Sequence, residues 1–245
     1  MQARRYPEAA TASRRSVEVL RGTGKPGAEG FAFFNLGKAL SGAGQAGESL
    51  GAFHRAGALL YEGGNLVYAS QAYFESGAML FRRGRFREAA LDFELAAEIS
   101  HAAGNDANEG SAYKNLGMAQ LKARMPDKAA EACRQAVAIF NSIRDIEQAV
   151  EAIATMMEAL AGNERYREAI PFVRETAMIC QEAGDREGEG MALVFLGAIL
   201  VDTGEYHEGV TVNQRAAVLL QAAGNEPMAD IALQHMRKAK ERRRL

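Results

Sequence analysis

The sequence predicts an all-α protein, a solenoid of about 12 antiparallel helices. Small residues recur every 40 residues along the 245-residue chain, with no insertion or deletion between them. Each period holds two stretches of helical apolar spacing separated by a glycine-containing break, as in residues 72–105. Hydrophobic residues make up 48% of the chain, which is enough for a stacked core. A fixed period of this length is typical of repeat proteins in which each unit packs on its neighbours.

Three slots of the period have a clear structural role. One slot always holds alanine, and it comprises Ala32, Ala72, Ala112, Ala152, Ala192 and Ala232. A second, five residues later, comprises Gly37, Gly77, Gly117, Met157 and Gly197. Small residues at these points let two helices approach closely, so a larger side chain would overpack the contact. The third slot closes the repeat and comprises Gly24, Gly64, Gly104, Arg144, Gly184 and Gly224.

The closing glycine suits a helix that ends in a left-handed turn, and the Asn or Asp after it is expected to cap the next helix. Arg144 departs from this pattern, so we expect its helix to end less cleanly. An aliphatic slot that includes Val19, Leu59 and Ile99 is expected to fill the core between helices.

The period predicts one continuous solenoid over residues 1–245. It comprises a half repeat at 6–23, full helix pairs at 28–63, 66–103, 107–143, 146–183 and 186–223, and a capping helix at 227–241. The chain begins inside a repeat, so Val17, Val19 and Leu20 should lack apolar cover. Either the chain is a fragment of a longer array or this face meets something else. Pro171 falls inside a helix and is expected to bend it.

The repeat resembles the tetratricopeptide repeat (TPR). The residues that carry the resemblance are Phe33, Leu36, Gly37, Leu40, Phe53 and Ala56, with an aromatic residue at the slot of Phe86 and a small one at the slot of Ala89. Forty residues is similar to the long-helix variant of GoLoco-binding adaptors, kinesin light chains and Rap-type regulators. The departures are Met156-Met157 in place of Leu-Gly, and Asn213 in the slot of Phe53.

The resemblance implies a right-handed superhelix whose first helices line a concave, peptide-binding groove. The candidate groove residues are Phe34, Asn35, Lys38, Phe74, Glu75, Arg82, Lys114, Asn115 and Lys122. An Asn amide can both donate to and accept from a peptide backbone, and the basic members favour a ligand with an acidic portion. The alternative is that Phe34 and Phe74 pack between repeats and that the basic side chains only keep the groove hydrated.

Composition excludes several classes of function. The net charge of −2 gives no basic field for nucleic acid, and no apolar run of 18 residues indicates a membrane span. Cys133 and Cys180 lack a disulfide spacing and fit a reducing compartment, so we expect a cytoplasmic protein. The G-x-G-x-x-G run at 22–27 follows a helix instead of the strand that a dinucleotide site requires.

No pair of histidines or cysteines has metal-ligand spacing, and no Ser/His/Asp or Cys/His set suggests catalysis. We therefore expect a non-enzyme without a cofactor. The leading hypothesis is a protein-interaction scaffold that binds a peptide or protein segment, one with an acidic part, in the concave groove. The alternatives are a self-assembling array joined through helix 6–23, which would be a homo-oligomer, and a regulatory or sensor segment of a larger multidomain signalling protein.

Overall fold

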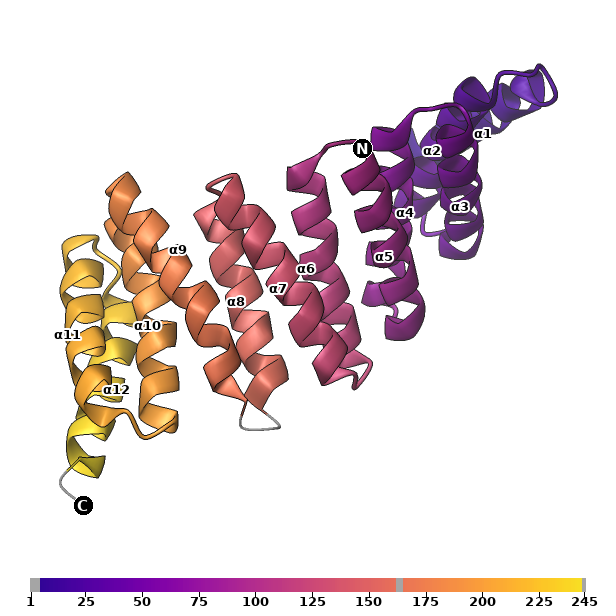
Figure 1. Ribbon diagram of the computed structural model, residues 1–245. Helices are drawn as coiled ribbons and strands as arrows, with labels where there is room; N and C mark the ends of the chain where they lie inside the picture. The colour runs from indigo at the N-terminus through magenta and orange to yellow at the C-terminus, as the bar shows by residue number, and fades with distance from the viewer. Residues whose placement is uncertain (1–4, 162–164, 244–245) are drawn as a thin grey trace. The chain divides into compact units, whose positions relative to one another are not determined.

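A computed structural model describes residues 5–161 and 165–243, and these residues form helices joined by short turns, without any strand. The helices are α1 (Arg5–Leu20), α2 (Pro26–Gly42), α3 (Ala46–Glu62), α4 (Leu66–Arg82), α5 (Phe86–Ala102), α6 (Asp106–Lys122), α7 (Pro126–Ser142), α8 (Ile146–Ala161), η2 (Tyr166–Ala169), α9 (Ile170–Ala183), α10 (Arg186–Asp202), α11 (Tyr206–Ala222) and α12 (Glu226–Arg242) (Figure 1). The all-α, repeated-helix prediction is confirmed. No helix within the described ranges is long and apolar enough to cross a membrane.

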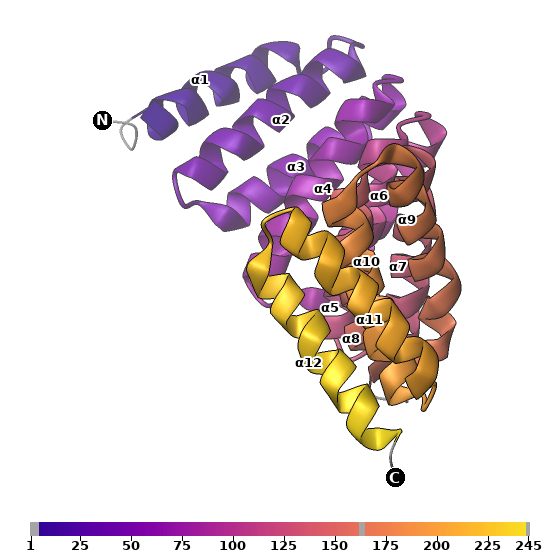
Figure 2. The same ribbon diagram turned by 90° about the vertical axis from the view of Figure 1, so that its left-hand side faces the viewer.

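The helices belong to two compact units, residues 1–124 with α1–α6 and residues 125–245 with α7–α12. Within the first unit each helix packs on the next along the chain, from α1 to α6, and α4 also contacts α6. Within the second unit α10 packs on α11 and α12 packs on both of them (Figure 2). That one solenoid runs through both units stays a prediction.

Most turns between helices in the described ranges repeat one left-handed conformation. In the turn after α2, Gly44 has a φ of +76° and the N–H of Gln45 donates to the carbonyl oxygen of Leu40 at 2.9 Å. The same φ region recurs at Gly64, Gly84, Gly104, Gly184, Gly204 and Gly224. A left-handed residue here ends the helix while still satisfying its last carbonyl groups.

Arg144 adopts this conformation as well, with a φ of +59°. The N–H of Asp145 donates to the carbonyl oxygen of Phe140 at 2.9 Å, as in the glycine turns. The expectation that α7 ends less cleanly is therefore wrong. The turn's hydrogen bonds impose the conformation, and an arginine bears the steric strain that a glycine would avoid.

The Asn or Asp after the turn that closes a repeat caps the following helix at four of five positions, as expected, whereas Gln45, Arg85 and Glu205, after the turns within repeats, make no such bond. A side-chain oxygen of Asn105 accepts from the N–H of Asn108 at 3.1 Å, and that of Asp185 accepts from Gly188 at 2.9 Å. Asp145 and Asn225 make the same kind of bond. Asn65 is the exception, because its amide donates instead to the carbonyl oxygen of Gly63 at 3.1 Å.

Glycine and aromatic residues pair inside the helix hairpins. A Cβ added to Gly37 would lie 2.8 Å from the ring of Phe53, and one added to Gly77 would lie 3.0 Å from Phe93. The ring therefore packs directly on the glycine backbone. The six residues of the alanine slot are all buried. These contacts explain why the small slots recur without exception in the first two full repeats.

Several expectations about individual residues are wrong. Pro171 does not bend a helix, because η2 ends at Ala169 and α9 begins at Ile170, so the proline lies in a first turn where no N–H is needed. Val17 keeps its apolar cover and is only 4% exposed, in a cluster with Leu36 and Leu40. Val19 is 75% exposed, so it lacks apolar cover as expected and does not fill the core, whereas Leu20 is partly buried against the same cluster as Val17. Helix α1 thus buries one side on α2.

Candidate functional site

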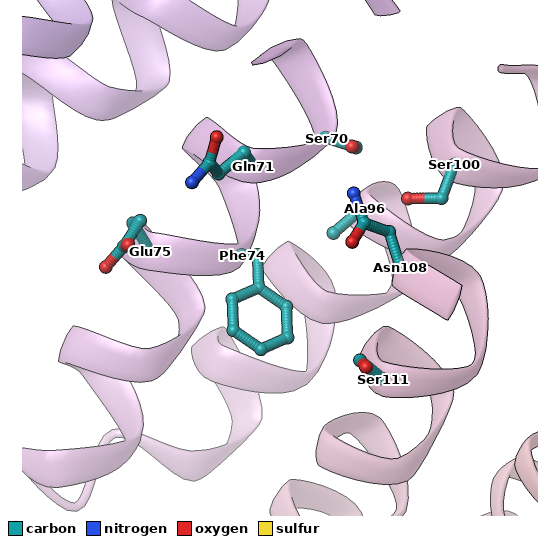
Figure 3. Close-up of a pocket in the computed structure, with 8 residues that line it drawn as sticks. All are labelled: Ser70, Gln71, Phe74, Glu75, Ala96, Ser100, Asn108 and Ser111. Atoms are coloured by element: carbon teal, nitrogen blue, oxygen red, sulfur yellow. The ribbon is translucent and has the colours of Figure 1, made fainter. Parts of the chain in front are cut away.

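A cavity of about 390 Å³ opens between α4, α5 and α6 of the first unit. It is lined by Ser70, Gln71, Phe74, Glu75, Ala96, Ser100, Asn108 and Ser111 (Figure 3). In Figure 3 the ring of Phe74 lies on one side, and Ser100, Asn108 and Ser111 lie on the other. This is the face of α4 and α6 on which the sequence predicts a groove.

Helix periodicity brings these residues together. Ser70 and Phe74 are four residues apart on α4, and Ala96 and Ser100 are four apart on α5, so each pair shares one face of its helix. Because α4, α5 and α6 pack on one another, the three faces meet at a common point. Two first helices thus form the walls, and α5 forms the floor.

Two serine hydroxyl groups of the lining already donate hydrogen bonds to the backbone of their own helices. The hydroxyl of Ser70 donates to the carbonyl oxygen of Val67 at 2.9 Å, and that of Ser111 donates to Ala107 at 2.8 Å. Each hydroxyl has a single proton, so both oxygens can act towards the cavity only as acceptors. No Lys or Arg belongs to the lining.

Phe74 is held by an edge contact with Phe93, whose ring centroid lies 5.4 Å away at an interplanar angle of 64°. Its ring remains only partly buried. Glu75 is also partly buried. Of the nine candidate groove residues, these two line the cavity.

Phe34 belongs to the core instead. It is 5% exposed, with the rings of Phe53 and Tyr68 at centroid distances of 5.9 Å and 6.1 Å. The packing alternative is therefore realised at this residue. The ammonium nitrogen of Lys38 lies 5.7 Å from the centroid of the Phe34 ring and adds a cation–π contact.

The remaining candidates lie on the first unit but outside the cavity lining. Asn35, Arg82 and Lys122 are exposed, whereas Lys114 and Asn115 are partly buried. The amide of Asn115 donates to the carbonyl oxygen of Ser111 at 2.8 Å, so part of its capacity is used within α6.

Sequence reasoning missed the roles of Ser70, Ser100 and Asn108. The signal was present in the period, since the slots 40 residues earlier hold Gly30, Leu60 and Tyr68. A polar side chain in a slot that holds glycine, leucine or tyrosine one repeat earlier marks a departure from the packing of that repeat. Residues that all repeats share do not reveal such departures, because the departures occur in single repeats.

A polar cluster that the sequence did not indicate lies between α3, α4 and α5. The Nε2 atom of His54 is 2.8 Å from Oδ2 of the buried Asp92 and 2.9 Å from the hydroxyl of Ser76. A nucleophilic relay requires the serine and the carboxylate to contact different ring nitrogens. Here both contact Nε2, so the geometry does not activate Ser76. The hydrogen bond with Asp92 raises the pKa of His54.

A second hollow of about 410 Å³ lies between α3, α4 and α5, and its lining is more apolar. Tyr61, Tyr73, Leu95 and Ile99 contribute most of its large side chains. Burial raises the pKa of Tyr73. Tyr61 and Leu95 are exposed, but no amide or hydroxyl other than the tyrosine phenols lines this hollow. It therefore offers less hydrogen-bonding capacity than the cavity between α4 and α6.

Comparison with solved structures gives the fold. The apo form of RapI aligns over 98% of this chain and 92% of its own, with a TM-score of 0.56 and 16% identity. BtubC (BKLC) from P. vanneervenii aligns over 89% of this chain and 92% of its own, with a TM-score of 0.56 and 18% identity.

A signal-transduction ATPase with a tetratricopeptide repeat sensor, PH0952 from Pyrococcus horikoshii, aligns over 96% of this chain and 37% of its own, with a TM-score of 0.51 and 19% identity. No protein-family profile and no curated protein sequence matches the chain. The chain therefore has a TPR-type helical-repeat fold, as the resemblance implied.

Proposed function

We propose that this protein is a non-catalytic interaction scaffold that binds a peptide or protein segment on the face formed by α4, α5 and α6. The observation that carries the proposal is the cavity lined by Phe74 together with hydroxyl and amide groups. Its volume of about 390 Å³ falls in the range of about 300–1,000 Å³ that ligand pockets occupy. Its lining is more polar than that of most ligand pockets, with six polar residues around Phe74 and Ala96, which suits a ligand that forms several hydrogen bonds.

The polar groups suit a polypeptide ligand. The amides of Gln71 and Asn108 can each donate and accept, as a backbone amide requires of its partner. The rim is open to a chain that runs across α4 and α6, since Gln71 is exposed and Asn108 is partly buried. A segment that crosses both helices would place one side chain in the cavity and its backbone against the amides.

The acidic portion of the ligand, if it has one, would contact residues beyond the cavity. Arg82 is exposed in the last turn of α4, and Lys38 is exposed on α2. Both lie on first helices of the first unit, outside the cavity lining. An extended ligand would therefore combine a side chain in the cavity with charge contacts towards the ends of the helices.

Affinity capture from a lysate of the source cell tests this proposal. The baits are the wild-type chain, Gln71→Arg, which places a long side chain over the cavity, and Gln214→Arg. Gln214 is exposed on α11 of the second unit, so it controls for the added charge. A partner held by wild type and Gln214→Arg but lost by Gln71→Arg is the expected result. A partner held equally by all three baits would refute binding at this face.

A further inference from the structure

The cavity lies at a place that the preceding repeat fills with its own side chains. Forty residues before Gln71, Ser100 and Asn108 stand Phe31, Leu60 and Tyr68. The Tyr68 ring packs edge-on against Phe31, with ring centroids 4.7 Å apart. The two rings, on α2 and α4, are thus replaced forty residues later by two shorter amides, on α4 and α6.

Phe34 and Phe74 occupy the same slot in successive repeats, but only Phe34 is covered by neighbouring side chains. Phe34 is covered by Tyr68, at a centroid distance of 6.1 Å, and by the ammonium group of Lys38. Phe74 keeps the equivalent edge contact with the phenylalanine of its own hairpin. However, the slots of Tyr68 and Lys38 hold Asn108 and Ala78, and Phe74 is only partly buried. Phe74 therefore presents a ring surface that lacks the aromatic neighbour of its counterpart.

The lining offers hydrogen-bond acceptors on both α4 and α6. The hydroxyl protons of Ser70 and Ser111 are used by backbone carbonyl groups of their own helices, at 2.9 Å and 2.8 Å. Their oxygen lone pairs remain for a donor, and the Glu75 carboxylate adds acceptors at the rim. A hydrocarbon ring would desolvate these oxygens without replacing their bonds to water, which is unfavourable. An anionic group could accept from the Gln71 and Asn108 amides, but it would be repelled by the Glu75 carboxylate with no Lys or Arg of the lining to offset that charge.

Building on the proposed scaffold function, we propose that the cavity binds a tyrosine side chain of the partner. The ring occupies the place that Tyr68 fills one repeat earlier and contacts Phe74 edge-on. The phenol O–H donates to Ser70 or Ser111. The cavity, at about 390 Å³, is larger than the space of about 150 Å³ that takes up a benzene molecule in another protein.

The test is a titration of the full chain, isotope-labelled for NMR, with N-acetyl-tyrosinamide. The side-chain amide signals of Gln71 and Asn108 are the readout. A dissociation constant on the order of 1 mM is expected for so small a probe. N-acetyl-phenylalaninamide should bind about two- to tenfold more weakly, because it lacks one hydrogen bond. N-acetyl-leucinamide and N-acetyl-phosphotyrosinamide should bind more weakly still.

Two variants locate the probe. Asn108→Tyr restores the residue type of the Tyr68 slot, so it should fold, fill the cavity from within and remove the response. Gln214→Tyr, on the second unit, controls for an added phenol. Ser70→Ala/Ser111→Ala removes the two acceptors and should bring the tyrosine probe down to the affinity of the phenylalanine probe. This second variant tests the hydrogen bond even if Asn108→Tyr does not fold.

The outcomes separate this inference from the proposed function. Equal affinity for the tyrosine and leucine probes, or tighter binding of the phosphotyrosine probe, would overturn the tyrosine assignment. So would retention of tyrosine preference by Ser70→Ala/Ser111→Ala. In those cases the scaffold function would stand as long as Gln71→Arg still loses the captured partner. If no probe shifts the cavity signals and Gln71→Arg also holds every partner, both proposals fail.

Discussion

Gly184 and Arg144 occupy equivalent left-handed turns in the second unit, and substitutions there should change its stability in opposite directions. A non-glycine residue in this conformation costs about 1–2 kcal/mol, because its Cβ crowds the following carbonyl oxygen. Glycine in turn loses about 0.4–1 kcal/mol through the greater freedom of the unfolded chain. Gly184 has a φ of +72°, and an added Cβ would meet nothing within 4 Å. Gly184→Ala should therefore lower the free energy of unfolding by about 0.5–1.5 kcal/mol, which is the backbone strain less the entropy term.

Arg144→Gly should raise the free energy of unfolding by a similar amount. One contact opposes the gain, since a guanidinium nitrogen of Arg144 lies 3.9 Å from a carboxylate oxygen of Glu182. Both side chains are 64% exposed, so this ion pair is worth about 0–1 kcal/mol. Making Arg144→Gly in a Glu182→Gln background removes the contact from the comparison. The expected gain there is about 0.5–1.5 kcal/mol.

Urea unfolding followed by far-ultraviolet circular dichroism measures both effects. Both residues lie in the second unit, so the same transition reports on them even if the two units unfold separately. The reasoning would be refuted if Gly184→Ala were neutral. It would also be refuted if Arg144→Gly in the Glu182→Gln background were no more stable than Glu182→Gln alone.

Three further predictions concern the core and its titratable groups. The hydrogen bond with Asp92 raises the pKa of His54 above 6.5, so its stabilising contribution is complete below pH 6.5 and is lost as the pH rises through the folded-state pKa. The unfolding midpoint should therefore fall more between about pH 6 and about pH 8 in wild type than in His54→Gln, and equal slopes would contradict this. Burial raises the pKa of Cys133 and Cys180 to about 12, so iodoacetamide at neutral pH should label them only after unfolding, as read by mass spectrometry. Ala89 is fully buried, so Ala89→Leu should lower the free energy of unfolding by about 1–3 kcal/mol by overpacking the helix contact at this position. A urea midpoint equal to that of wild type would show that the site can take a larger side chain.

The helices could be predicted because each repeat makes the same helix–helix contacts, and those contacts require the same residue types at the same slots. Gly37 and Gly77 seat the rings of Phe53 and Phe93, and this requirement shows in the sequence as a strict period. The left-handed turns were equally visible wherever glycine occupies them. Arg144 shows the limit of that signal, because the turn's hydrogen bonds can hold a residue that is intrinsically unsuited to the conformation.

The cavity could not be found in the same way, because it arises from departures from the period. Asn108 and Gln71 are ordinary polar residues in isolation, and only the rings of Tyr68 and Phe31 at the preceding slots show what they replace. Phe34 and Phe74 show the same limit of prediction from a repeated slot. Both were candidate groove residues at one slot, yet one is buried and the other lines the cavity. What differs is the neighbour across the helix pair, which no single repeat contains.

The uniform turn has a genetic consequence. Helix α3 ends before Gly64-Asn65 and α5 before Gly104-Asn105, so the two junctions carry the same dipeptide. Deletion of the codons for 66–105 would place Asn65 directly before Asp106. The left-handed turn at Gly64 would stay intact, and Asn65 would take the place of Asn105 before α6. Unequal recombination between such junctions would shorten or lengthen the array by whole hairpins. It would do so without shifting the register of the slots on either side.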